Sequence, residues 1–359
     1  MSGKTFLHAL AERFELAIPV PGSHRTSCDR LAARGYPLLI SSSKKIALLS
    51  LAALAICPSG LFAECSNQLT EVVYVISGNQ ILEFDESGNF ILKFGGTGNG
   101  PGQFQLPSGI VVSNDSGHVF VTDALLNRIQ VFDHCGQLLS VPGTGALQIG
   151  STGTGPGFLY HPYGITVDGF KNLWVADTGN NRIEVFNQGG AFLFQMGGLG
   201  GGNGQFNAPT SLAFTDTLWV SDTGNNRIQQ FSIGYGNPQV LLPVSATFLQ
   251  KFGTYGNGNG QFRGPFGIVS DGPHVWVADS QNQRVQEFTS GGVFLGQISP
   301  FSYPSPYGIT LDGAGIWTVD YNTNQVILYS LTGAKLLSFG GSLLFHPTYI
   351  AVGLTTGYV

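Results

Sequence analysis

The chain has 359 residues, of which 42% are hydrophobic and only 10% are charged, and its 52 glycines are too many for a helical protein. An aromatic content of 12% excludes a disordered chain, so the composition favours a globular, all-β protein. Residues 1–63 carry seven of the 16 Lys and Arg residues and three of the 21 Asp and Glu residues, within a net charge of −5. The remainder therefore has nine bases against 18 acids, which excludes the basic surface of a nucleic-acid-binding protein.

Residues 44–63 are typical of a secretory signal peptide. Lys44 and Lys45 precede the apolar run IALLSLAALAI, and a Pro/Gly break then leads to the small residue Ala63. The run is too short to span a bilayer, so we expect no stable membrane span in the mature form. The alternative is a buried core helix, although no polar face or cap accompanies the run. We expect cleavage near Ala63 and a secreted, periplasmic or extracellular protein.

Residues 1–43 predict no fold of their own. They contain scattered arginines and no clear element pattern. They are either an unusual leader or the result of a start placed too far upstream, and the sequence leaves both open.

From about residue 70 onwards the chain repeats one pattern. Residues 174–186 read WVADTGNNRIEVF and residues 219–231 read WVSDTGNNRIQQF. In four units an aspartate lies five residues before an arginine: Asp123 and Arg128, Asp177 and Arg182, Asp222 and Arg227, Asp279 and Arg284. A fifth unit has Asp320 and Gln325 at these positions. Three residues before each aspartate stands an aromatic residue, and all four tryptophans of the chain occupy this position: Phe120, Trp174, Trp219, Trp276 and Trp317. Each unit opens on a proline: Pro107, Pro162, Pro209, Pro265 and Pro306.

Each unit predicts four short strands. Apolar and polar residues alternate in runs such as GITVD, LWVAD and RIEVF, which are separated by Gly, Asp and Asn. Units of this kind must stack on neighbours to bury both faces, and radial stacking gives a β-propeller. Residues 345–352 form an opening strand without a successor, and residues 72–96 form the three later strands without an opening one. Joined, they predict a sixth blade in which the C-terminal strand completes the N-terminal blade and closes the ring.

The repeat resembles that of the NHL-repeat six-bladed β-propellers. The segments GNGPGQFQLPSGI with FVTDALLNRIQVF, and GNGNGQFRGPFGI with WVADSQNQRVQEF, match the family pattern, and the resemblance covers residues 70–359. Members of this family include scaffolds, protein and RNA binders, extracellular sensor domains and a few lyases. The resemblance therefore implies an all-β, six-bladed fold and leaves the function open.

The aspartates and arginines of the repeat are predicted to be structural. Asp177 is expected to accept hydrogen bonds from its own turn and from Arg182, because a catalytic pair would not recur in nearly every blade. The glycine runs 96–102 and 198–204 resemble phosphate-binding loops, but no helix follows them. We interpret them as connectors between blades.

Two histidines suggest an enzymatic alternative. His161 and His346 stand directly before Pro162 and Pro347, where the chain enters an inner strand. The peptidylglycine amidating lyases, which are propellers of this family, use channel histidines to bind zinc. The third ligand of such a site would fall on Gly264, so the resemblance implies no three-histidine site. A metal-dependent lyase or hydrolase with zinc or calcium in the channel, held by two histidines, stays open as the alternative.

The favoured hypothesis is a binding or scaffold module that carries no cofactor and acts as a monomer. The residues after the opening prolines are aromatic or carry hydroxyl groups, and Tyr163, Phe266, Tyr307 and Tyr349 are the candidate ligand-binding residues at the channel mouth. The partner would be a protein, a peptide or a glycan. The alternative is that these rings only pack against one another.

Two cysteines remain after removal of the leader, which contains Cys28 and Cys57. Cys65 precedes the first strand of the closing blade, and Cys135 lies in a turn of the adjacent blade, on the same predicted face. We expect a disulfide between them in an exported protein, with two free thiols as the alternative.

Overall fold

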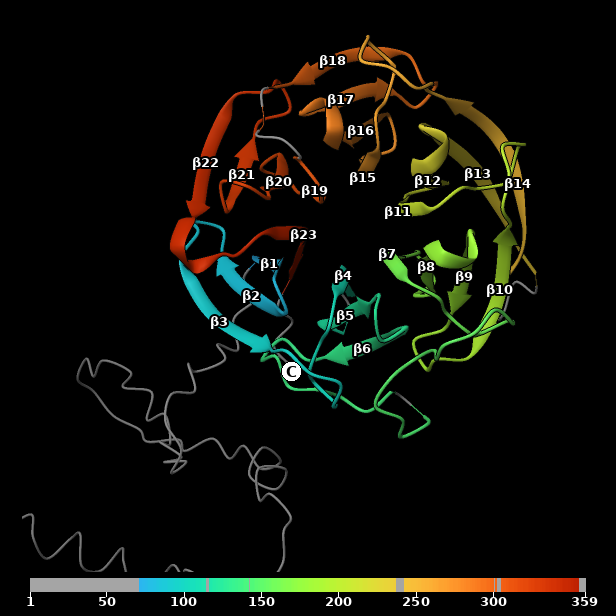
Figure 1. Ribbon diagram of the computed structural model, residues 1–359, viewed down its shortest axis with the longest axis vertical. Helices are drawn as coiled ribbons and strands as arrows, with labels where there is room; N and C mark the ends of the chain where they lie inside the picture. Colours follow the sequence, from blue (N-terminus) through green and yellow to red (C-terminus); the bar gives the residue numbers. More distant parts are fainter. Residues whose placement is uncertain are drawn as a thin grey trace, which may run out of the picture. The chain divides into compact units, whose positions relative to one another are not determined.

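The structure, a computed structural model, describes residues 71–113, 116–141, 143–236, 242–299, 301 and 305–354. Within these ranges regular structure consists of strands and short 3₁₀ turns (Figure 1). None of the helices there has the length and apolar character that crossing a membrane requires. The leader, the signal-like segment 44–63 and Cys65 lie outside the described residues.

Six sheets surround a common centre, as Figure 1 shows. Blade one contains β4 (Pro107–Ser113), β5 (His118–Asp123) and β6 (Arg128–Phe132). Blade two contains β7 (Pro162–Val167), β8 (Leu173–Asp177), β9 (Arg182–Phe186) and β10 (Phe192–Gly197). Blade three contains β11 (Pro209–Phe214), β12 (Leu218–Asp222), β13 (Arg227–Tyr235) and β14 (Pro243–Phe252). Blade four contains β15 (Pro265–Ser270), β16 (His274–Asp279), β17 (Arg284–Thr289) and β18 (Phe294–Ile298). Blade five contains β19 (Ile309–Leu311), β20 (Ile316–Asp320), β21 (Gln325–Tyr329) and β22 (Lys335–Gly340).

The sixth blade combines the two ends of the described chain and confirms the predicted closure. It consists of β23 (Pro347–Leu354), β1 (Glu71–Ser77), β2 (Gln80–Asp85) and β3 (Phe90–Gly95), in that order from the centre outwards. Strands β23 and β1 pair antiparallel, with Ala351 opposite Tyr74. The backbone groups along the facing edges of β1 and β23 are thereby paired, and the ring has no open seam between blades five and one.

The opening prolines mark the start of five of the six inner strands. Each of these prolines pairs across the sheet with the last residue of the second strand, as Pro162 does with Asp177. Because the second strand ends there in its hairpin, this register places the entry loop against the hairpin turn of the same blade. Three of these turns contain a short 3₁₀ segment: η2 (Thr178–Asn180), η3 (Thr223–Asn225) and η4 (Ser280–Asn282). A further 3₁₀ turn, η5 (Gly341–Leu343), precedes β23, and β19 begins at Ile309, three residues after Pro306.

Blade one departs from the four-strand prediction, because its sheet has three strands. The outer segment makes only isolated bridges, from Leu138 to Phe132 and from Ile149 to Ile129. Between them the chain turns away from the sheet, and the N–H of Val141 donates to the carbonyl of Ala146 at 2.6 Å. The extra residues in this segment therefore split the outer strand into two short contacts.

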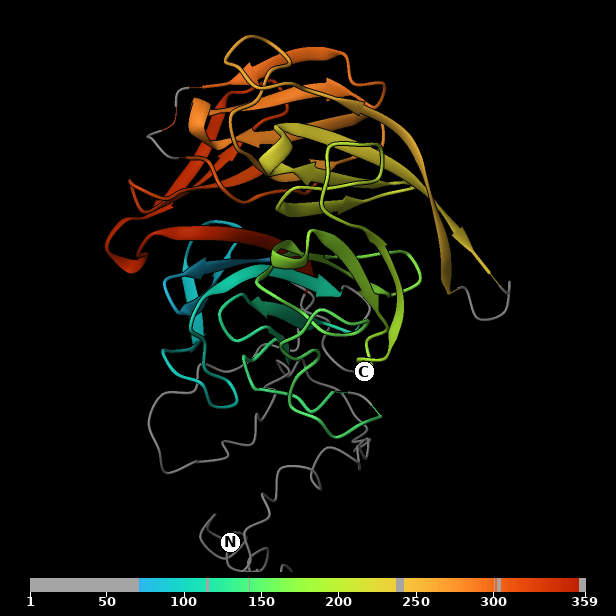
Figure 2. The same cartoon turned by 45° about the vertical axis from the view of Figure 1, so that its right-hand side comes forward.

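Blade three carries an outer hairpin that is longer than its counterparts. Strands β13 and β14 have nine and ten residues, and Figure 2 shows the hairpin extending past the other blades. The end of the hairpin contacts blade two. There the hydroxyl of Tyr235 donates to Asp168 at 3.0 Å, and the ring of Tyr235 packs edge-on against Phe170 with centroids 4.5 Å apart.

The core consists of apolar layers between neighbouring blades. One aromatic residue from the second strand of every blade lies in these layers, and each is at most 1% exposed: Tyr74, Phe120, Trp174, Trp219, Trp276 and Trp317. Removing such a ring by substitution with alanine typically costs about 3–5 kcal/mol. Tyr74, three residues before Ser77, is the sixth member of the aromatic position that the sequence predicted in five units.

Candidate functional site

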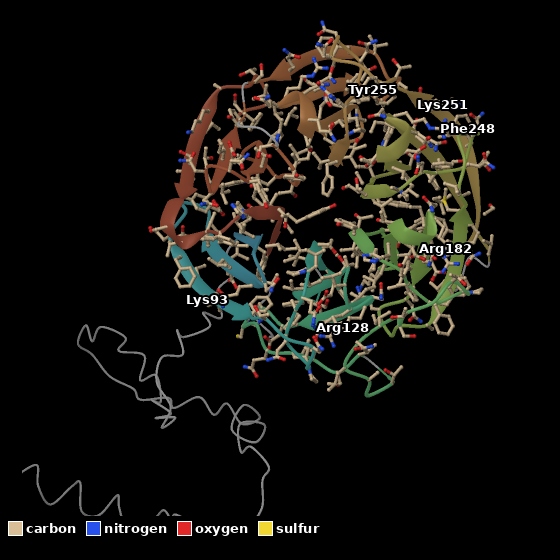
Figure 3. All side chains as sticks on the ribbon, viewed as in Figure 1. Lys93, Arg128, Arg182, Phe248, Lys251 and Tyr255 are labelled. Atoms are coloured by element: carbon tan, nitrogen blue, oxygen red, sulfur yellow. The ribbon has the colours of Figure 1, made fainter. Side chains whose placement is uncertain are left out.

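The DTGNNR segment of blade two closes its own hairpin. One carboxylate oxygen of Asp177 accepts a hydrogen bond from Nε of Arg182 at 2.8 Å, and the other accepts the N–H of Tyr160 in the entry loop at 2.7 Å. Asp222 with Arg227 at 2.6 Å, and Asp279 with Arg284 at 2.9 Å, repeat the ion pair. Burial raises the pKa of Asp177, although the hydrogen bonds from Tyr160 and Arg182 act to lower it. Figure 3 shows Arg182 within the body of the blade.

The same segment also binds the next blade. The hydroxyl of Thr178 donates to the carbonyl of Pro209 at 2.6 Å, and the side-chain oxygen of Asn181 accepts the N–H of Ala208 at 2.8 Å. Blade three repeats both bonds one blade further on, from Thr223 to Pro265 and from Gly264 to Asn226. The near-copies in the sequence are therefore repeated junctions between blades, and their polar groups are used within the fold.

Blades one and six hold this hairpin turn through other contacts. Asp123 accepts the N–H groups of Gln105 and Leu106, while the Nη2 atom of Arg128 donates to the carbonyls of Gly100 and Gln103. The buried Nε of Arg128 has no hydrogen-bond partner among the described residues, so the predicted pair is not formed here. In blade six Ser77 replaces the aspartate, and its hydroxyl accepts the N–H of Phe345 at 2.6 Å.

The glycine runs are tied to the sheets beside them. The N–H of Gly102 donates to the side-chain oxygen of Gln130 at 2.8 Å, and the N–H of Gly204 donates to that of Gln229 at 3.0 Å. These amides are committed to side chains of the third strand, as expected for connectors and not for a phosphate cradle.

His161 and His346 occupy a position that requires a left-handed backbone, with φ of 48° and 47°. Their N–H groups donate to the side chains of Asn127 and Asn324, both at 2.7 Å. The imidazole of His346 stacks on Tyr321 with a centroid separation of 4.3 Å. No group of three or more His, Cys, Asp or Glu side chains in the described ranges is arranged to hold a metal ion.

A pocket of about 310 Å³ lies at the mouth of the channel. All four predicted ligand-binding residues line it, together with Leu106, Pro107, Ser108, Tyr321 and Thr348. None of these nine side chains carries a formal charge at neutral pH. A pocket of this composition suits an apolar or aromatic group that also forms hydrogen bonds.

The aromatic rings line the pocket and also pack on one another. Phe266 lies edge-on to Tyr307, with centroids 5.0 Å apart, and also contacts Tyr163 and Tyr349 at 6.0 and 5.6 Å. Tyr349 is only 6% exposed, and its hydroxyl donates to the carbonyl of Thr210 on the opposite side of the ring at 2.7 Å. It therefore forms the floor of the pocket, and burial raises the pKa of its hydroxyl.

A second cavity of about 160 Å³ lies deeper in the channel and is lined by the inner strands. Tyr349 lines both cavities, so its ring separates the mouth from the channel. Sequence reasoning placed Tyr349 at the mouth but missed Tyr321, whose ring is tilted by 58° to that of Tyr307 with centroids 5.5 Å apart. The available signal was the turn of blade five, which reads DYNTNQ and has a tyrosine where blades two and three have threonine.

Cys135 lies in the turn after β6, where Asp133 accepts its N–H at 2.9 Å. Its sulfur is disulfide-bonded. Because Cys65 lies outside the described residues, the pairing of Cys65 with Cys135 stays a prediction.

A family model described as a 6-bladed beta-propeller matches residues 70–141. NHL repeat-containing protein 3 of Homo sapiens is 30% identical over 144 residues, which are 36% of this chain and 39% of that protein. Protein brain tumor of Drosophila melanogaster is 28% identical over 141 residues, 39% of this chain and 12% of that protein. The chain therefore spans less than half the length of either relative.

One chain of the nidogen/laminin complex has a similar fold, with a TM-score of 0.58 and 16% identity over 80% of this chain and 99% of that chain. At that identity the likeness concerns the fold alone. The repeats, the ring of six sheets and the matched family model agree on the fold: the described part of the chain is a six-bladed β-propeller, and its repeats are similar to those of NHL repeat-containing proteins.

Proposed function

We propose that this propeller is an exported binding module that captures a peptide or a segment of another protein in the mouth pocket. The observation that carries the proposal is the uncharged pocket of about 310 Å³ at the centre of the entry face, with aromatic walls. An apolar or aromatic side chain of the ligand enters it and packs on Phe266 and Tyr307. A few such central contacts supply most of the energy in protein interfaces.

The rim of the pocket offers further contact area on the same face. Phe345 is 64% exposed and Tyr160 is 44% exposed, and each stands two residues before an opening proline. Exposed rings around a central pocket suit an extended polypeptide, whose side chains bind the rings while its backbone meets the hydroxyl groups. A glycan is the competing ligand, because sugar faces also stack on aromatic rings.

The test is selection of ligands on the exported protein with a peptide display library and a glycan array in parallel. We expect the enriched peptides to contain an aromatic or large aliphatic residue. The Tyr163→Ala and Tyr307→Ala variants should no longer bind these peptides. The matched control is Tyr255→Ala, since Tyr255 is 65% exposed on a connector and does not line the pocket. Peptides that bind all variants equally would place the site elsewhere. Enrichment of glycans alone would show that the ligand is a glycan and not a peptide.

Export is the second part of the proposal and rests on the signal-like segment 44–63. N-terminal sequencing of protein recovered outside the cytoplasm is expected to begin at or near Glu64. A mature chain that begins at Met1 would refute it.

A further inference from the structure

A third cavity, of about 150 Å³, lies between blades four and five and shares no lining residue with the mouth pocket. Trp276, Glu287 and Gly296 line it and are direct cross-strand neighbours, with Trp276 opposite Glu287 and Glu287 opposite Gly296. Directly opposed residues project from the same face of a sheet, about 5 Å apart. The indole and the carboxylate therefore share one wall, and at the third position there is no side chain.

Blade three shows the same place occupied. There Gln230 stands at the position of Glu287, and Gln250 stands at the position of Gly296. The side-chain nitrogen of Gln250 donates to the side-chain oxygen of Gln230 at 2.6 Å and to the carbonyl of Ser290 in the next blade at 2.5 Å. An N–H donor thus fills this space in blade three and connects two blades.

Blade four retains the acceptors of this arrangement and lacks the donor. Leu331, in the turn of blade five that corresponds to Ser290, lines the cavity. A Cβ atom at Gly296 would lie 3.8 Å from the carboxylate of Glu287, an ordinary contact, so the space is open toward the acid. No described residue donates a hydrogen bond to that carboxylate. Its titratable neighbours are His274 and Asp271, and Nδ1 of His274 lies 3.2 Å from the carboxylate of Asp271.

We propose that this cavity binds an aliphatic ammonium or guanidinium group, whose N–H donors take the place of the Gln250 side-chain nitrogen. The cation donates to Glu287 and to the carbonyl of Leu331, and lies beside the indole of Trp276. A carboxylate selects a positive donor over a neutral amide, and an adjacent indole favours the same charge. The side chain of Leu331, which is 51% exposed, packs on the aliphatic part.

The test uses saturation-transfer NMR on the complete exported protein with n-butylammonium chloride, and with n-butanol as the neutral probe of the same length. We expect a saturable signal from butylammonium and none from butanol. Glu287→Gln should weaken binding about tenfold or more, because it removes the charged acceptor. Gly296→Gln should abolish binding, since it rebuilds the glutamine of blade three, and the backbone at Gly296 is not left-handed.

Gln230→Glu is the matched control, because it places the same acid in the occupied site of blade three and should add no second binding event. Melting curves of all variants verify that each is folded. N-acetyl-lysine methylamide then distinguishes the source: binding equal to that of butylammonium indicates a lysine side chain, and binding of butylammonium alone indicates a free amine. Equal signals from butanol and butylammonium, or unchanged binding by both Glu287→Gln and Gly296→Gln, would overturn the proposal.

Discussion

Glu184 Oε1 lies 2.8 Å from Nη2 of Arg182, so one guanidinium serves two buried carboxylates, those of Glu184 and Asp177. Burial raises the pKa of Glu184 to about 7; the charge of Arg182 opposes this rise and that of Asp177 adds to it. Three other blades carry glutamine at this position: Gln130, Gln229 and Gln286. Like the side-chain oxygens of these glutamines, Oε2 of Glu184 accepts a backbone N–H from a glycine-rich connector, that of Gly157, at 2.9 Å.

Glu184→Gln is therefore expected to stabilise the protein above neutral pH. A carboxyl whose folded pKa exceeds its ordinary value of 4.5 contributes its full stability below about pH 4.5 and loses it as the pH rises through about 7. The glutamine carries no such penalty, so the variant should gain roughly 1–3 kcal/mol at pH 8 and little at pH 4.5. Urea unfolding at both pH values measures the difference. Gln229→Glu should show the opposite dependence on pH, and a Glu184→Gln variant that is less stable than the parent at pH 8 would contradict the argument.

The repeat made the fold predictable, whereas the details of single blades were not. Strand alternation, the opening prolines and the unmatched end fragments predicted six blades and their closure, because these signals recur in each unit. The split outer strand of blade one was missed, since it follows from extra residues near Val141 in that blade alone. The role of Tyr349 as a floor depends on a contact with Thr210, 139 residues away in the chain, and no local pattern encodes that distance.

Asn127 and His161 allow the structural role of the histidine to be measured. The side chain of Asn127 accepts the N–H of His161, whose φ of 48° favours glycine. Asn127→Ala leaves this N–H without a partner and should cost about 1–3 kcal/mol in thermal or urea unfolding. His161→Gly should change stability by less than about 1 kcal/mol, because Gly264 fills the same position in blade four. A large loss from His161→Gly would show that the imidazole itself is needed.

The same histidine variants test the metal-dependent alternative. Metal analysis of the purified exported chain, before and after substitution of His161 and His346, is expected to show no stoichiometric zinc or calcium. One metal ion per chain that disappears with either substitution would favour the lyase or hydrolase over the binding module.

Cys65 and Cys135 are expected to form a disulfide in the exported protein. The bond would join the segment before β1 to the turn after β6 and so secure the chain beside the closing blade. Closure of a loop of about 70 residues contributes about 4 kcal/mol in the chain-entropy model. A peptide map under non-reducing conditions should show the linked pair, and reduction should lower the melting temperature. Recovery of both cysteines as free thiols from oxidised, exported protein would refute the pairing.

Tyr349 joins blade six to blade three through its hydrogen bond to the carbonyl of Thr210 and separates the mouth pocket from the deeper cavity. Tyr349→Phe keeps the ring and removes the bond, so it should cost about 1 kcal/mol and leave ligand capture at the mouth intact. Tyr349→Ala removes the floor and connects the two cavities, and a loss of about 3–5 kcal/mol is expected for a buried aromatic ring. Tyr255→Phe, at an exposed position, is the control and should change stability by less than about 0.5 kcal/mol. Urea unfolding measures the stability of all three variants. A Tyr349→Ala protein as stable as Tyr349→Phe would show that the aromatic ring of Tyr349 does not stabilise the closed floor of the pocket.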